Sequence, residues 1–160
     1  METDLQWLIS SMTSALYAGQ RIAQGRSLVD VKLAAALEPA VKVLETVLSG
    51  VGISSDQFFE HAIPSATRFD AADRLAEVAA AKILGPAAAE AARTTIARQL
   101  IALSQAFTAA SPDTLAELEL RGNPLREQWE ARGPGLLAAL ARRAAPELLA
   151  DTASVVLVMP

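Results

Sequence analysis

The sequence predicts a mainly α-helical protein, a bundle of about four to five principal helices with a small C-terminal α/β appendage of one or two short strands. Alanine, the residue with the highest helix propensity, fills 34 of the 160 positions. Apolar residues recur at steps of three and four along much of residues 1–110, as on one face of a helix. The exception is residues 154–159, whose β-branched and apolar run favours a strand. We therefore expect a helical bundle over residues 1–110 and an appendage over residues 111–160 that packs on it.

The N-terminal segment predicts a first helix that begins at a Thr3 cap, continues to about Gln24 and ends at Gly25. Trp7 falls at the edge of its apolar face. This tryptophan either covers the rim of the core or anchors a partner, because tryptophan is enriched at binding hot spots. The apolar face itself consists of Leu5, Leu8, Ile9, Met12, Leu16 and Ile22.

A second helix is expected to begin near residues 27–30, which resemble a capping box, and to end at Gly50. Its wide apolar sector indicates the most buried helix. Pro39 lies inside it and predicts a kink or a short restart, because proline lacks a backbone donor and crowds the preceding turn. Glu38 and Lys42 are spaced as an ion pair on its wet side.

Residues 54–57 indicate another helix start, followed by the densest aromatic patch in the chain. Phe58, Phe59 and His61 form a candidate pocket for a small molecule. His61 is the only histidine and stands beside Glu60, so it is either a general base or metal ligand, or an ordinary capping or surface residue. A catalytic zinc site needs three protein ligands, and no such set is apparent. The sequence predicts no metal and no cofactor.

Residues 70–110 form the predicted spine of the bundle, a helix-forming stretch interrupted at Gly85-Pro86 and capped at Asp70. Small residues let another helix approach closely and leave little room for a ligand, so the spine is interpreted as scaffold. Its second half carries one continuous apolar face: Ala89, Ala92, Ile96, Leu100, Leu103 and Phe107.

The last fifty residues predict two strands and two helical segments. Residues 118–121 alternate with period two, as in a half-buried strand, and a helix should follow from Asn123 to Arg132 before a break at residues 133–135. Strand 154–159 is apolar on both faces and needs neighbours. The internal candidate is residues 118–121, through a right-handed crossover. Because two strands alone are marginal, the pair is either capped by the helical domain, completed by another chain, or part of a larger protein that continues past residue 160.

Residues 121–132 place Trp129 among arginines and alternating acids, between Gly and Pro on both sides. One interpretation is that Trp129 docks the tail onto the bundle while the arginines pair with Glu127 and Glu130. The other is a recognition surface for another protein. The candidate interaction surface consists of Trp7, Arg126, Trp129 and Arg132.

Several functional classes are disfavoured. A net charge of −4 without a basic cluster argues against nucleic-acid binding, and no apolar run reaches the ~18 residues of a membrane span. Cysteine is absent, which excludes disulfides and thiolate chemistry and fits a cytoplasmic location. No phosphate loop, dinucleotide fingerprint or nucleophile elbow occurs, which argues against an enzyme.

The favoured function is therefore a non-catalytic interaction or assembly module that acts through an apolar Trp-Arg surface, on a protein partner or as a homo-oligomer. Two alternatives remain open. The chain is the N-terminal domain or a fragment of a larger enzyme or regulator whose chemistry lies beyond residue 160, or it is a helical small-molecule sensor.

Overall fold

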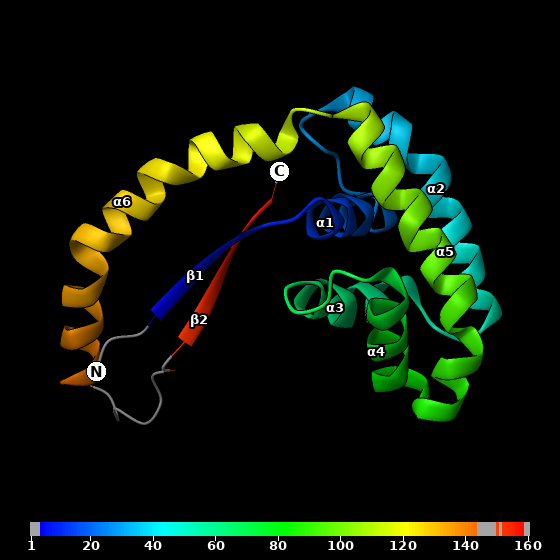
Figure 1. The fold of residues 1–160 in the computed structure, drawn as a ribbon. Helices are drawn as coiled ribbons and strands as arrows, with labels where there is room; N and C mark the ends of the chain where they lie inside the picture. Colours follow the sequence, from blue (N-terminus) through cyan, green and yellow to red (C-terminus); the bar gives the residue numbers. More distant parts are fainter. Residues whose placement is uncertain (1–3, 144–149, 151, 159–160) are drawn as a thin grey trace.

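The computed structural model describes residues 4–143, 150 and 152–158. These residues form a mainly α-helical protein with a small α/β appendage, as the composition predicts (Figure 1). The elements follow in the order β1 (Asp4–Ile9), α1 (Ser11–Ala23), α2 (Val31–Gly50), α3 (Ser55–Ala66), α4 (Ala72–Leu84), α5 (Pro86–Ala110), α6 (Thr114–Ala141) and β2 (Thr152–Leu157).

Helices α1 to α5 form the bundle and enclose the core, with α5 in contact with α1, α2 and α4. The apolar face predicted for the spine is confirmed, because all six of its residues are buried. In α2 the buried residues are likewise the predicted apolar ones: Leu33, Leu37, Val41, Leu44 and Leu48. Local periodicity therefore identifies both faces correctly.

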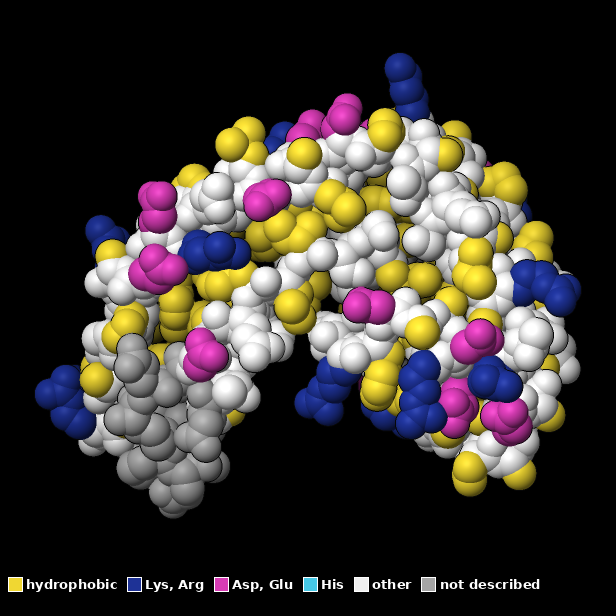
Figure 2. Space-filling view, viewed as in Figure 1, with side chains coloured by type: hydrophobic (Ala, Val, Ile, Leu, Met, Phe, Trp, Pro, Cys, Tyr) yellow, Lys and Arg dark blue, Asp and Glu magenta, His cyan; other side chains and the backbone are white. Residues whose placement is uncertain are grey.

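Helix α6 leaves the bundle after Ser111 and extends away from it above the two strands, so the molecule has the shape of an arch (Figure 1). Its 28 residues correspond to a length of about 42 Å. We call the unit of β1, β2 and α6 the arm. A hollow separates the far part of the arm from α3 and α4 in the space-filling view (Figure 2).

The predicted N-terminal helix is wrong in its first turns, because residues 4–9 form strand β1. Helix α1 begins only after Ser10, whose hydroxyl accepts a hydrogen bond from the Thr13 amide at 3.3 Å. Six residues are too few for periodicity to separate a helix from a strand. Their conformation is decided by pairing with β2, which lies almost the whole chain away.

Strands β1 and β2 form a parallel two-stranded sheet in which Trp7 pairs with Val155 and Ile9 with Leu157. The predicted partner for the C-terminal strand, residues 118–121, is therefore wrong. Those residues lie in α6, where Leu118 is buried and Glu117 forms an ion pair with Arg121 across one turn at 3.5 Å. The strand itself spans residues 152–157 rather than 154–159, and residues 159–160 lie outside the described residues.

The helix start predicted at Asn123 and the break predicted at residues 133–135 are also wrong, because Pro124 and Pro134 lie inside a continuous α6. Helix α2 continues through Pro39, so it does not restart there, and α3 contains Pro64. Each proline lacks a backbone N–H donor, and its ring crowds the preceding turn of the helix. A proline inside a helix therefore bends it. Figure 1 shows that α6 curves along its length over the strands.

The start of α4 differs from the prediction. The cap position is Ala71 rather than Asp70, and Arg74 pairs with Glu77 at 2.8 Å. In contrast, the predicted pair of Glu38 and Lys42 forms at 2.6 Å. The hydrogen bond from Lys42 lowers the pKa of Glu38, and both side chains remain mostly exposed.

The cap of α2 is Asp30 rather than Ser27, and this gives a first prediction. One Asp30 carboxylate oxygen accepts hydrogen bonds from the Lys32 and Leu33 amides at 2.9 and 3.1 Å. Asp30→Ala is expected to lower the free energy of unfolding by about 1 kcal/mol in a urea titration. Asp30→Asn retains an acceptor oxygen and should stay close to the wild type. An equal loss in both variants would contradict the capping role.

Candidate interaction site on the arm

An apolar groove of about 510 Å³ lies on the arm, between α6 and the sheet. We call it the Trp groove. Three of the four residues predicted for an interaction surface line it, and the fourth, Arg126, lies over the ring of Trp7 at 5.7 Å. The structure therefore brings Trp7, near the start of the chain, next to residues of the segment 121–132. The lining residues are Trp7, Leu125, Gln128, Trp129, Arg132, Gly133, Leu136, Val155 and Leu157.

Helical and strand periodicity together position this lining. On α6, residues 125, 129, 132 and 136 follow steps of three and four and so share one face. On the sheet, Trp7 and Val155 are register partners, and Leu157 follows Val155 by two residues. Side chains two apart on a strand point to the same face. The groove is thus the seam between one helix face and one sheet face.

The arginines of the site are not neutralised by the neighbouring acids. Within the part of the chain that the structure describes, neither Arg126 nor Arg132 has a carboxylate within 4.0 Å. The predicted pairing with Glu127 and Glu130 is therefore absent there. Arg126 instead makes a cation–π contact with Trp7, an interaction of about 0.5–1 kcal/mol when exposed. The guanidinium donors remain available to a ligand.

Two buried glycines of α6 determine how closely side chains approach this helix. A Cβ atom at Gly133 would overlap the indole of Trp129, and one at Gly122 would overlap the side chain of Leu157. Sequence reasoning missed both, since it interpreted Gly133 as a helix break. The signal was present in the spacing, because Leu118, Gly122, Leu125, Trp129, Gly133 and Leu136 follow helical steps.

The predicted pocket residues Phe58 and Phe59 belong to the core of the bundle. Both are completely buried, and their rings meet edge to face with centroids 6.0 Å apart. His61 is half-buried, and its backbone carbonyl accepts a hydrogen bond from the Ser65 hydroxyl at 2.7 Å. The Trp groove and two further cavities, one beside α4 and one beside the start of α2, are lined by other residues. A small-molecule role for these three residues stays a prediction.

The chemistry that the Trp groove offers is apolar surface with a few hydrogen-bond donors. Gln128 and Arg132 are the polar side chains of its described lining, which includes no carboxylate. Tryptophan and arginine surrounded by aliphatic side chains are typical of the centres of protein interfaces. Among the described residues, no group of three or more His, Asp or Glu side chains is placed to hold a metal ion.

The described helices include none with both the length and the apolar character needed to cross a membrane. The chain matches no protein-family model, no curated protein and no solved structure.

Proposed function

We propose that this protein is a non-catalytic assembly module, and that the Trp groove and the adjoining face of α6 bind α6 of a second copy of the chain. The observation that carries the proposal is the convergence of Trp7, Arg126, Trp129 and Arg132 on one open apolar groove. Residues of these types concentrate binding energy when a partner excludes water from them.

Exposed leucines extend the apolar surface beyond the groove. Leu125 and Leu136 line it but are 52% and 58% exposed, and Leu140 lies one turn further along the same helix face. In Figure 2, hydrophobic side chains gather along the concave side of α6. Contiguous apolar patches of this kind are uncommon on monomeric proteins and favour a protein partner. Because the patch is elongated along α6, a second long helix would match its shape.

The arm has little support from the bundle. Helix α6 packs mainly on β1, and its contacts with α1 to α5 are weak. A parallel sheet of two strands is marginally stable by itself, and within the described residues each strand has one unpaired edge. Association of two arms would bury apolar surface that one arm leaves in water.

Charge along α6 favours a second copy in an antiparallel arrangement. The start of the helix carries Asp113, Glu117 and Glu119 together with Arg121, the ion-pair partner of Glu117, whereas its end carries Arg132, Arg142 and Arg143. In the middle, between residues 122 and 131, the charged residues are Arg126, Glu127 and Glu130. A two-fold axis near the middle of α6 would place the acidic start of each helix beside the basic end of the other. A parallel pair would oppose like charges.

Light scattering after size-exclusion chromatography tests the proposal. We expect the wild type to have twice the 16.8 kDa mass of the chain. Leu136→Asp places a charge in the apolar seam and should weaken dimerisation by about 100-fold, which corresponds to roughly 2.7 kcal/mol. Leu120→Asp is the matched control, because Leu120 is 72% exposed and does not line the groove.

A charge-swap pair tests the antiparallel arrangement. Arg142→Glu with Arg143→Glu, and Glu117→Arg with Glu119→Arg, should each be monomeric alone and form a heterodimer when mixed. A monomeric wild type would contradict the second copy as the occupant. A dimer that is unaffected by Leu136→Asp would contradict the Trp groove as the interface.

A further inference from the structure

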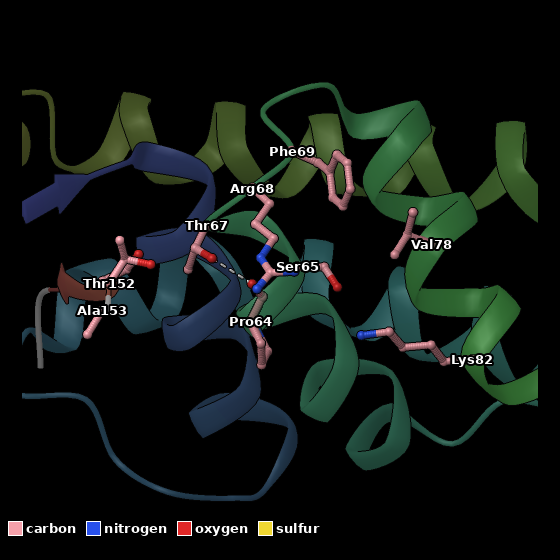
Figure 3. A pocket seen from close by; sticks show the side chains of 10 residues that line it. Pro64, Ser65, Thr67, Arg68, Phe69, Val78, Lys82, Thr152 and Ala153 are labelled. Carbon is pink, nitrogen blue, oxygen red and sulfur yellow. Dashed lines mark hydrogen bonds between the residues drawn. The ribbon is translucent and has the colours of Figure 1, made fainter. Parts of the chain in front are cut away.

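A second cavity, of about 640 Å³, lies between the bundle and the start of β2 (Figure 3). Its walls come from the end of α3, the connection to α4, the outer face of α4 and the first residues of β2. Its described lining residues all differ from those of the Trp groove. On β2, the first residues Thr152, Ala153 and Ser154 line this cavity, whereas Val155 and Leu157, further along the strand, line the groove.

Positive charge lines the described part of this cavity. Arg68 and Lys82, both exposed, belong to its wall, and none of its described lining residues is Asp or Glu. Figure 3 shows Arg68 extending from the α3–α4 connection and Lys82 from α4 toward the space between them. Throughout the described ranges, neither side chain makes an ion pair or a side-chain hydrogen bond. In a chain of net charge −4, two uncompensated cations in one cavity favour an anion.

The hydroxyl groups of the wall add further donors. Thr67 donates to the Pro64 carbonyl at 2.8 Å and Ser65 donates to the His61 carbonyl at 2.7 Å, so both protons are already engaged. The hydroxyls of Thr152 and Ser154 make no hydrogen bond to the described part of the chain. The groups without a hydrogen-bond partner in the described part of the chain, all on exposed residues, are therefore the guanidinium, the ammonium and these two hydroxyls. Donors of this kind bind carboxylate or phosphate oxygens.

The rest of the wall is apolar, with Pro64, Phe69 and Val78. The volume falls within the range of small-molecule sites, about 300–1,000 Å³, and exceeds what an inorganic ion fills. We infer that this cavity binds a small organic anion, whose carboxylate or phosphate lies between Arg68 and Lys82 and whose apolar body packs on Phe69 and Val78. Because the walls belong to the bundle and to the arm, such a ligand holds β2 beside α3 and α4.

Isothermal titration calorimetry with four probes tests this inference on the full chain. Phenyl phosphate and benzoate differ only in the anionic group, and the tighter of the two identifies which group the cavity prefers. Saturable binding of at least one is expected. Inorganic phosphate lacks the apolar body and benzyl alcohol lacks the charge, so both should bind at least about tenfold more weakly. Equal binding of benzyl alcohol or of inorganic phosphate would overturn the inference, as would no saturable binding of either organic anion.

Substitutions locate the site. Arg68→Gln combined with Lys82→Gln should weaken anion binding by about tenfold or more, whereas the exposed Arg98→Gln on α5 should leave it unchanged. Equal affinity in the double variant and the wild type would overturn the inference. Leu136→Asp should bind the anion as the wild type does, so a failure of the proposed dimer remains distinguishable from a failure of this site.

Discussion

Phe59→Ala is expected to lower the free energy of unfolding by about 3–5 kcal/mol. Phe59 is completely buried, packs edge to face on Phe58, and lies against Gly19 of α1. Truncation removes apolar burial and leaves a cavity that the surrounding helices fill only in part, because the close approach at Gly19 already holds α1 near α3. Urea unfolding followed by circular dichroism at 222 nm measures the loss.

Leu120→Ala on α6 is the control for this truncation, since the side chain is 72% exposed. Its expected change is within about 0.5 kcal/mol. A decrease in the free energy of unfolding of less than about 1 kcal/mol in Phe59→Ala would show that the position is loosely packed. That result would support the pocket predicted around Phe58, Phe59 and His61. A large loss fits a scaffold role for this part of the bundle.

Gly133→Ala and Gly135→Ala are expected to have opposite effects although they lie two residues apart on α6. A Cβ atom at Gly135 meets nothing within 4 Å, so alanine should stabilise the helix by about 1 kcal/mol. At Gly133 the new methyl group overlaps the indole of Trp129. The indole must rotate, and we expect the cost of overpacking, about 1–3 kcal/mol, to outweigh the gain in helix propensity, so that Gly133→Ala lowers the free energy of unfolding.

Thermal unfolding and tryptophan emission together measure this difference. Gly135→Ala should raise the melting temperature and leave the emission maximum unchanged. Gly133→Ala should shift the emission, because Trp129 lines the Trp groove, and should weaken the proposed dimer. Identical behaviour of the two variants would contradict the packing of Trp129 on Gly133.

The candidate site could be predicted in part. Trp7, Arg126, Trp129 and Arg132 were identified from residue type alone, because tryptophan and arginine concentrate binding energy. That Trp7 joins the others depends on the pairing of β1 with β2, which periodicity does not reveal. The cavity with Arg68 and Lys82 was not predicted, since its walls come from segments about 70 residues apart whose side chains are individually ordinary.

The sequence by itself predicted the helical class and the apolar faces of α2 and α5. Helix propensity and the 3.6-residue spacing of apolar side chains depend only on residues that are close together in the chain. The tertiary structure decided the rest. Residues 4–9 form a strand because β2 supplies their hydrogen bonds from the other end of the chain. Residues 118–135 stay helical through two prolines, in a helix whose Gly122 and Gly133 accommodate Leu157 and Trp129. Such contacts join residues far apart in the sequence, so the propensities of neighbouring residues do not predict them.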